Sequence, residues 1–463
     1  MMLVLQAAPL LVLLGLLLSG RAGPVPAVAA ALVAAVPAAL ASLPADVPAL
    51  PFLAEEAARG AFLALKPILV VTGGLLFHAA VTGAARPALA PPAPRRIFVA
   101  TLLVGAFMES VTGFAVGAVF ALSALRGMGI GGAPAGAMAL LALTLVPWGG
   151  LGPGTALGAA LVGLPPQTLA EATAWPNAVW YLLMGPVLWR LCAAAKLQVP
   201  RRERLAQMAL LAMVAGGLVL SHRLFPFEVA GLLATAGPTL WALWRLDPPR
   251  GAEGWRRAMR GMAPYLGLTA ALLLARAWPA APAWTPFADL PGFPATHVGI
   301  VLWAVSAVLL AGRARLAGPA LRRAGRPAAA MLLYVVLARW LAGSGIAGAL
   351  AGAAAQALGP AAPFAVPVIG LVSGMVTGTN VGSNAALMPV QAGLGQAAGM
   401  EGWLAPSLHN FAGAAGAGMS FAVTAMICAL LADGTRPATL WRLLLPSILA
   451  VPAIGWVVIL VSR

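Results

Sequence analysis

Two short stretches of this chain place polar side chains and glycines inside otherwise apolar sequence. From Gly105 the sequence reads GAFMESVTGFAVGA, and from Gly370 it reads GLVSGMVTGTNVGS. The triplet VTG recurs in both, and in both a VG pair follows it after two further residues. A helix broken by glycines exposes backbone polar groups, which lipid tolerates only where they line a polar cavity. We interpret the two stretches as paired halves of a binding site; close helix packing through small residues is the alternative.

A second Gly-rich break follows each of these stretches. It reads WGGLGPGT from Trp148 and NFAGAAGAG from Asn410. Corresponding broken apolar segments in two halves of a chain are typical of secondary transporters built from inverted repeats. In such proteins the substrate site lies where the two repeats meet.

Glu109 is the acidic residue that lies deep in an apolar stretch, beside the first expected turn. A carboxyl group in such a setting can be neutral or charged near physiological pH, depending on its neighbours. This property suits a proton carrier, and our hypothesis is that Glu109 takes up a coupled proton. The alternative is that Glu109 only accepts hydrogen bonds from the exposed amides of the turn.

An anionic substrate needs hydrogen-bond donors, and two features of the breaks supply them. Helix N-termini present free amides and the positive end of the helix dipole. Hydroxyl and amide side chains could bind a carboxylate and an adjacent hydroxyl, although Ser, Thr and Asn also cap broken helices without a ligand. The residues that we expect to bind substrate are Thr112, Gly113, Thr377, Gly378, Thr379, Asn380, Ser383, Asn384, Asn410 and Arg339.

Arg339 and His409 are ionisable residues within apolar runs. Arg339 could be the counter-ion of a substrate carboxylate or the partner of Glu109, or it could extend its head group to the membrane interface. His409 could join the site or a proton path, or it could be an interfacial histidine.

The composition identifies an integral membrane protein. Hydrophobic residues make up 61% of the 463 positions and charged residues 9%, with a mean hydropathy of +0.94. The net charge of +16 comes from basic residues in short gaps between apolar runs, so it indicates membrane topology and not nucleic-acid binding. No GxSxG, HExxH, CxxC or His-rich spacing is present, so we expect no enzyme activity, cofactor or metal site.

Apolar runs predict about twelve transmembrane helices, and the stretches near 97–126 and 363–395 are left over. If both stretches are re-entrant hairpins of opposed orientation, every basic cluster lies in the cytoplasm. Two full membrane crossings in each stretch would place the loops on the same sides. We therefore expect an all-α polytopic protein of the inner (plasma) membrane with two hairpins in inverted repeats. The basic clusters are Arg86/Arg95/Arg96, Lys196/Arg201/Arg202/Arg204, Arg245/Arg250/Arg256/Arg257/Arg260, Arg313/Arg315/Arg322/Arg323/Arg326 and Arg436/Arg442.

The expected organisation is a single integral membrane domain. N-terminal helices occupy 1–60, repeat 1 occupies 61–245 and repeat 2 occupies 261–463. No basic region precedes the first apolar segment, so we expect a retained span and not a cleaved signal peptide. The composition is compatible with a homo-oligomer.

The repeated stretches resemble segments of the L-lactate permease family. GAFMESVTGFAVGA is similar to the family's Gly-x-Phe-Leu-Glu followed by Gly-Phe-Gly-x-Pro, although the proline is absent here. VIGLVSGMVTGTNVGSNAALMPVQ is similar to its Leu-Thr-Gly-Ser-Asn-Thr-x-Ser-Asn segment, which ends in Leu-Gln. Glu109 corresponds to the family's Glu, and Ser383 and Asn384 to its final Ser-Asn. Segments from Arg260, Leu337 and His409 extend the likeness over most of the chain.

The resemblance implies a hairpin-containing transporter that carries L-lactate or a related small 2-hydroxy monocarboxylate, such as glycolate, together with protons. The alternative is a sodium-coupled transporter of another organic or inorganic anion, since Thr, Asn and Ser side chains with unwound carbonyls can also bind sodium. The expected partners are the monocarboxylate, protons or sodium, and the lipid bilayer.

Overall fold

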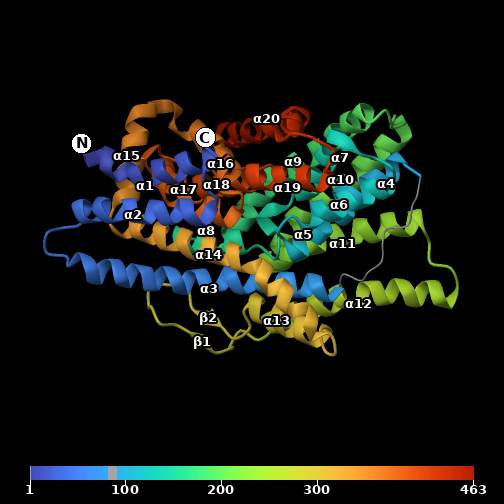
Figure 1. Cartoon of the computed structure of the whole chain (residues 1–463), viewed down its shortest axis with the longest axis horizontal. Helices are drawn as coiled ribbons and strands as arrows, with labels where there is room; N and C mark the ends of the chain where they lie inside the picture. The colour runs from blue at the N-terminus through green and yellow to red at the C-terminus, as the bar shows by residue number, and fades with distance from the viewer. Residues whose placement is uncertain (1, 82–90, 463) are drawn as a thin grey trace.

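A computed structural model describes residues 2–81 and 91–462, and helices account for most of them (Figure 1). Within these residues, seven helical segments are long and apolar enough to cross a membrane. The expectation of an all-α polytopic membrane protein is confirmed, although seven segments meet this description where about twelve were expected. The segments are Pro24–Ser42, Ala49–Val81, Arg201–Leu224, Gly251–Arg276, Ile346–Thr377, Leu404–Leu431 and Pro437–Val461.

The first part of the chain contains the longest helix of the described residues, α3, which runs along the long axis of the molecule in Figure 1. Its 33 residues span about 50 Å, more than the roughly 30 Å of a hydrocarbon core. α3 packs against two helices of the later part, α13 and α14. The elements here are α1 (Met2–Leu18), α2 (Pro24–Ser42) and α3 (Ala49–Val81). Arg86, in the first basic cluster, lies outside the described residues.

The next part contains the first repeated stretch and the first Gly-rich break. A continuous helical run from Pro94 to Thr112 turns back into a second helix, and we call residues 94–127 hairpin 1. Break 1, at 144–152, then separates two short helical runs. The elements are α4 (Pro94–Phe98), the π-helix η1 (Val99–Gly105), α5 (Ala106–Thr112), α6 (Val116–Gly127), α7 (Gly132–Leu140), the 3₁₀ turns η2 (Leu141–Leu143) and η3 (Val146–Trp148), α8 (Pro153–Leu161), α9 (Pro166–Ala194), α10 (Arg201–Leu224) and α11 (Phe227–Leu246).

The last part of the chain also contains a helix-turn-helix followed by a break, and both come after α12, a two-stranded ribbon and the helices α13 to α15. Its helix-turn-helix at 362–397 is hairpin 2. The expectation of a break within the Gly-rich segment from Asn410 is wrong, because that segment is helical up to Gly418 and its glycines pack against α16; break 2 follows it at 419–420. The elements are α12 (Gly251–Arg276), the antiparallel β1 (Ala283–Trp284) and β2 (Phe293–Pro294), α13 (Val298–Leu309), η4 (Ala314–Leu316), α14 (Ala317–Gly343), α15 (Ile346–Leu358), η5 (Gly359–Ala361), α16 (Ala362–Thr377), α17 (Asn380–Ala397), α18 (Leu404–Gly418), α19 (Phe421–Leu431) and α20 (Pro437–Val461).

Both hairpins turn at a glycine in a left-handed backbone conformation. Gly113 has φ 67° and Gly378 has φ 78°, values that glycine adopts without steric cost. The repeated VTG triplet therefore marks the end of the first arm in each hairpin. The re-entrant and opposed placement of the two hairpins in the membrane stays a prediction.

Glycines also bring α16 and α18 into direct backbone contact. A Cβ atom at Gly374 would lie 1.8 Å from the carbonyl oxygen of Gly413, and one at Gly416 would lie 2.1 Å from that of Leu371. No larger residue fits at these positions, as in other close helix crossings in membranes. Small-residue packing thus explains part of the glycine content, alongside the turns.

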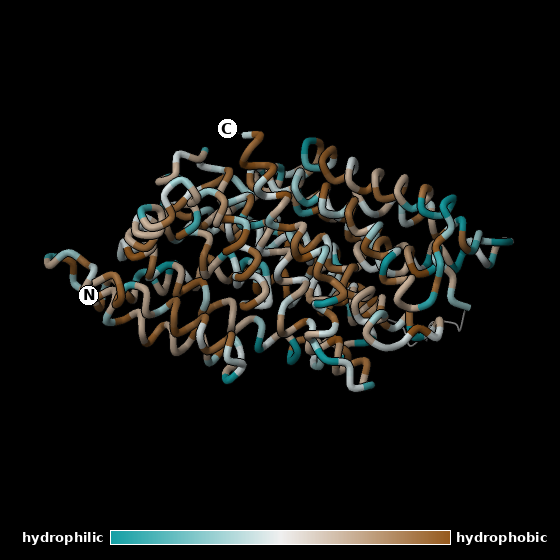
Figure 2. Tube along the Cα trace, turned by 90° about the horizontal axis from the view of Figure 1, so that it is seen from above, coloured by the Kyte–Doolittle hydropathy of each residue, from teal (hydrophilic) through white to brown (hydrophobic). Residues whose placement is uncertain are grey.

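Hydrophilic residues gather mainly toward the ends of the long axis, and hydrophobic residues cover most of the trace between them (Figure 2). Arg95 forms an ion pair of 2.9 Å with Glu203, which brings the first two basic clusters together. This contact agrees with the expectation that both clusters lie on the same side of the membrane.

Candidate functional site

The tip of hairpin 2 meets the helix that precedes break 2 through buried amide side chains. Asn380 and Asn384, in the first two turns of α17, both donate from Nδ2 to the Oδ1 atom of Asn410 on α18, at 3.0 and 2.9 Å. Asn384 and Asn410 are fully buried. Asn410 thus holds the start of α17 against α18.

The same side chains bind residues of the first half of the chain. Nδ2 of Asn410 donates to the hydroxyls of Thr155 on α8 and Thr173 on α9, at 3.0 and 3.1 Å. Nδ2 of Asn384 also donates to the carbonyl oxygen of Gly154, at 2.9 Å. Figure 1 shows α17 and α18 beside α8. We call Asn380, Asn384, Asn410, Thr155 and Thr173 the amide cluster, and it joins residues 154–173 to residues 380–410.

Two oxygen atoms of the amide cluster have no donor within the described residues. They are Oδ1 of Asn380 and Oδ1 of Asn384, both shielded from solvent. Each Nδ2 donates to acceptors only, so the amide orientations follow from the hydrogen bonds. Buried acceptors without donors are rare in proteins and call for an explanation such as a bound water, ion or ligand. The amide cluster therefore offers free acceptors to a hydroxyl group or a cation.

The hydroxyls at the turn of hairpin 2 act as helix caps. Oγ1 of Thr379 accepts from the Gly382 amide at 2.9 Å, which satisfies one free donor at the start of α17. Oγ1 of Thr377 donates to the Ser373 carbonyl at 2.8 Å, one turn earlier in α16. With Gly378 between them, these residues set the direction in which α17 leaves the turn.

Hairpin 1 presents a carboxylate where hairpin 2 presents neutral groups. Glu109 is 3% exposed, and its Oε1 and Oε2 atoms accept from the amides of Ala115 and Gly117, both at 3.2 Å. The carboxylate thereby caps the start of α6, where the helix dipole favours negative charge. In the described part of the chain Glu109 forms no ion pair. These are the hydrogen bonds of the capping alternative, while proton uptake by Glu109 stays a prediction.

Thr112 and Gly113 belong to the contact between hairpin 1 and break 1. Oγ1 of Thr112 donates to the Met108 carbonyl at 2.6 Å, within its own helix. A Cβ atom at Gly113 would lie 3.1 Å from the amide nitrogen of Gly150, so the turn and the break pack closely. The Gly150 amide donates to the Glu109 carbonyl at 2.9 Å. These residues are not hydrogen-bonded to the amide cluster.

No family model matches this chain. No curated protein sequence matches it either. Among solved structures, it is similar to one described as the crystal structure of the Alcanivorax borkumensis YdaH transporter, which reveals an unusual topology. The match has a TM-score of 0.45 and 18% identity, and it covers 90% of this chain and 88% of that one. The likeness names neither a substrate nor a coupling ion for this chain.

Arg339 takes part in a different set of contacts. Its Nε and Nη2 atoms both lie 2.7 Å from Oε2 of Glu56, on α3. Glu56 also lies 3.6 Å from Arg59, which pairs with Asp289 in the segment between α12 and α13. The suggested pairing of Arg339 with Glu109 is thus wrong, because Glu56 lies within the long α3 helix and supplies a nearer carboxylate. Its role as a substrate ligand stays a prediction.

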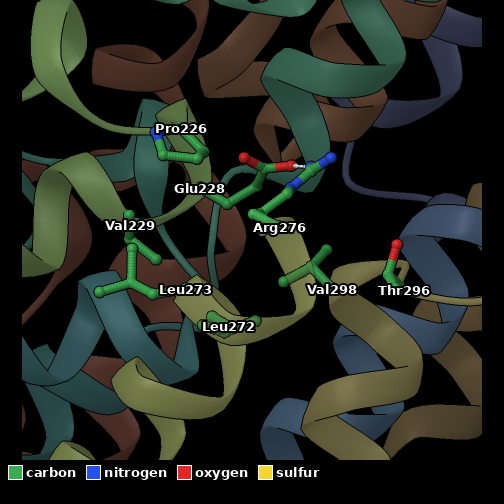
Figure 3. A pocket seen from close by; sticks show the side chains of 8 residues that line it. All are labelled: Pro226, Glu228, Val229, Leu272, Leu273, Arg276, Thr296 and Val298. Atoms are coloured by element: carbon green, nitrogen blue, oxygen red, sulfur yellow. Dashed lines mark hydrogen bonds and ion pairs between the residues drawn. The ribbon is translucent and has the colours of Figure 1, made fainter. Parts of the chain in front are cut away.

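The cavity shown in Figure 3 contains none of the expected site residues. It lies between α11, α12 and α13, and the carboxylate of Glu228 and the guanidinium of Arg276 point toward each other there as an ion pair. The other lining residues are Pro226, Val229, Leu272, Leu273, Thr296 and Val298.

Sequence reasoning missed two threonines of the amide cluster. Thr155 ends the Gly-rich segment WGGLGPGT, so its place beside break 1 was a usable signal. Thr173 lies within the long helix α9, where a threonine often only bonds its own backbone, as its 2.7 Å contact with the Leu169 carbonyl illustrates. Only the folded structure brings it to Asn410.

Proposed function

We propose that this chain is a secondary active transporter of the inner (plasma) membrane that carries L-lactate, or a related 2-hydroxy monocarboxylate such as glycolate, by proton symport. The observation that carries the proposal is the amide cluster. It contains side chains from both halves of the chain, it is built from a hairpin tip and both Gly-rich segments, and two of its acceptor oxygens have no donor among the described residues. A site at the junction of two repeats is the arrangement that alternating access requires.

The chemistry of the cluster suits a small hydroxy acid. A substrate hydroxyl group can donate to Oδ1 of Asn380 or Asn384, which lack donors in the described part of the chain. The substrate carboxylate can accept from amides in the first turn of α17, an 18-residue helix whose positive dipole end lies at the cluster. Both contacts favour a substrate with adjacent carboxylate and hydroxyl groups.

The resemblance to the L-lactate permease family supports the same substrate class. Ser383 and Asn384 correspond to that family's final Ser-Asn, and Asn384 is a member of the amide cluster. Thr377, Gly378 and Thr379 then position α17, while Thr112 and Gly113 position hairpin 1 against break 1. No cofactor is part of the proposed cycle, and no enzymatic step is needed.

Uptake of radiolabelled L-lactate into proteoliposomes tests this function. We expect uptake that needs an imposed pH gradient, is inhibited by glycolate and is unaffected by succinate or sulfate. Without a gradient, and with lactate on both sides of the membrane, the protein should still exchange labelled for unlabelled lactate. If folded protein neither accumulates nor exchanges lactate, the substrate assignment is overturned.

Glu109 is proposed as a carrier of the coupled proton. The Glu109→Gln variant removes one protonatable group, so the lactate accumulation ratio should fall by about tenfold for each unit of imposed pH difference. Exchange at equal pH measures substrate binding in the same vesicles and should be retained. Accumulation equal to that of the unaltered protein would leave Glu109 with a capping role only.

Sodium coupling of another organic or inorganic anion is the second candidate, and the two free Asn oxygens favour it specifically. Neutral oxygen atoms from side chains and unwound backbone are the ligands that bind sodium in transporters with broken helices. Uptake that follows an imposed sodium gradient and ignores the pH gradient would replace the proton-coupled assignment. The same vesicle preparation serves for both measurements.

A further inference from the structure

His409 is a fully buried histidine next to Asn410 on α18. Its Nε2 atom lies 3.2 Å from the carbonyl oxygen of Ser383 and 3.3 Å from the hydroxyl of the same residue. A carbonyl oxygen can only accept, so the proton of the neutral ring is assigned to Nε2. Nδ1 is then left as a bare acceptor, and it has no hydrogen-bond partner among the described residues.

Ser383 connects this histidine to both arms of hairpin 2. Its hydroxyl donates to Oγ of Ser373 at 3.0 Å, and Ser373 lies on α16 whereas Ser383 lies on α17. Ser373, Ser383 and His409 form a buried chain of polar groups, which we call the His409 relay. His409 and Ser383 immediately precede Asn410 and Asn384, so the relay and the amide cluster occupy successive positions on α18 and α17.

The helices packed against α18 bring no charged side chain to His409. α8, α16, α17 and η3 contain no ionisable residue. On α9, the hydroxyl of Tyr181 donates to the Leu102 carbonyl and Cys192 is buried in the apolar core. The charged residues of α9 and α20, all of them exposed, are Glu171, Arg190 and Arg442.

We propose that His409 binds a second coupled proton, which makes lactate transport electrogenic. The proton comes from water on the outer side, is held on Nδ1 while Nε2 keeps its own proton, and leaves to water on the inner side. Once protonated, Nδ1 becomes a donor, and the substrate carboxylate bound at the neighbouring amide cluster serves as its acceptor. This inference rests on the proposed function.

A charge count over one cycle gives the electrical consequence. In the loaded state, a protonated Glu109 is neutral and the imidazolium of His409 offsets the substrate carboxylate. In the empty state, Glu109 is a carboxylate and His409 is neutral. The loaded site therefore carries one positive charge more than the empty one. Each cycle moves two protons and one lactate anion, which transfers one net positive charge across the membrane.

The test is the response of lactate accumulation to membrane potential in proteoliposomes. A tenfold potassium gradient with valinomycin, inside negative, should raise the accumulation ratio of the unaltered protein about tenfold at equal pH. The His409→Gln variant carries one proton fewer and should lose this response while still responding to a pH gradient. Accumulation in the variant that keeps the full response to potential would overturn the inference.

The matched control is His222→Gln. His222 is also a buried histidine, 1% exposed, with a ring nitrogen, Nε2, that has no partner in the described part of the chain. It lies on α10, outside the amide cluster and the relay. We expect it to keep the response to potential. If the unaltered protein transports lactate with protons but ignores potential, the second proton is refuted and the proposed function stands.

A measurement on the unaltered protein covers the case in which His409→Gln does not fold. Infrared difference spectra of protein with isotope-labelled histidine report whether a ring gains a proton when lactate is added. We expect an imidazolium signal that persists in His222→Gln. Lactate binding without any change in histidine protonation would also refute the inference.

Discussion

Hairpin 1 and hairpin 2 have similar sequences, but the first turn of the second helix is capped by a different kind of side chain in each. In each hairpin, a glycine in the first turn of the second arm has an amide that needs an acceptor from outside its own helix. These glycines are Gly117 and Gly382. The amide of Gly117 donates to the carboxylate of Glu109, whereas that of Gly382 donates to the hydroxyl of Thr379. One cap is ionisable and comes from the preceding arm, and the other is neutral and comes from the turn.

The turns differ in backbone conformation as well. Hairpin 1 has positive φ at Phe114 and Ala115 in addition to its glycine, at 58° and 59°. Such values are uncommon for residues with a Cβ atom and persist where surrounding contacts hold them. Hairpin 2 has the left-handed conformation at its glycine, and Thr379 is extended. The Glu109 carboxylate, bonded to the Ala115 amide, is part of what holds the strained turn.

The two hairpins also differ in the charge of the side chains at their tips. Hairpin 1 contributes a single buried ionisable group and apolar residues at the positions that correspond to Asn380 and Asn384, which are Ala115 and Val119. Hairpin 2 contributes neutral amides and hydroxyls that bind both halves. A repeat pair with one titratable and one neutral tip fits a carrier in which proton coupling and substrate binding are distributed between the two.

The largest effect is expected from Gly374→Ala, at the position that corresponds to Glu109. The new Cβ atom would lie 1.8 Å from the Gly413 carbonyl, so the helices must separate. Overpacking costs about 1–3 kcal/mol or more, and we expect loss of monodisperse protein in detergent. Gly348→Ala on α15 is the control, because nothing lies within 4 Å of its Cβ position. An unchanged elution profile for both variants would contradict the close contact.

Asn410→Leu should have the next largest effect, because this side chain joins α17 and α18 to α8 and α9. Its loss leaves buried donors of Asn380 and Asn384 with fewer acceptors, at a cost of about 1–3 kcal/mol. We expect a lower thermal unfolding midpoint and loss of lactate uptake. Gln391→Leu is the matched control: Gln391 is buried, but its side-chain atoms lack partners in the described residues, so its removal should be neutral or stabilising.

Glu109→Gln should lower stability as well as coupling. A glutamine side chain has one acceptor oxygen, whereas the carboxylate serves the amides of both Ala115 and Gly117. A hydrogen bond to a charged group contributes about 1.5–3 kcal/mol, and one of the two is lost. Thermal unfolding in detergent measures the effect, and a midpoint equal to that of the unaltered protein would argue against a capping role for the carboxylate.

Thr379→Val should have the smallest effect of the series. It removes the hydroxyl cap of α17 and keeps the shape of the side chain, at a cost of about 1 kcal/mol. Thr379→Ser keeps the hydroxyl and should stay close to the unaltered protein. A loss larger than that of Glu109→Gln would reverse our ranking of the two caps.

Both hairpin turns and break 1 could be predicted from the sequence, because glycines and capping residues act over a few positions. The second Gly-rich segment was different, since its glycines serve close helix packing and the break follows the segment. The VTG triplets mark both turns, and Asn380, Asn384 and Asn410 do lie together. Partners from distant helices could not be predicted. Thr173 reaches Asn410 from 237 positions away, and Glu56 reaches Arg339 from 283 positions away, so neither contact leaves a local pattern. The cap formed by Glu109 was foreseen as an alternative, since the carboxylate and the amides are neighbours in sequence.

The backbone contact between α16 and α18 has a mechanical consequence. With glycine opposite carbonyl oxygen at Gly374 and Gly416, the two helices have no side-chain layer that could deform between them. Ser373 and His409 therefore belong to one closely packed pair of helices. The boundary with α8 and α9 combines apolar packing of Met388 against Ala159 and Leu169 with side-chain hydrogen bonds to Gly154, Thr155 and Thr173, which water could replace. If two parts of the protein separate during transport, we expect them to separate between α17/α18 and α8/α9.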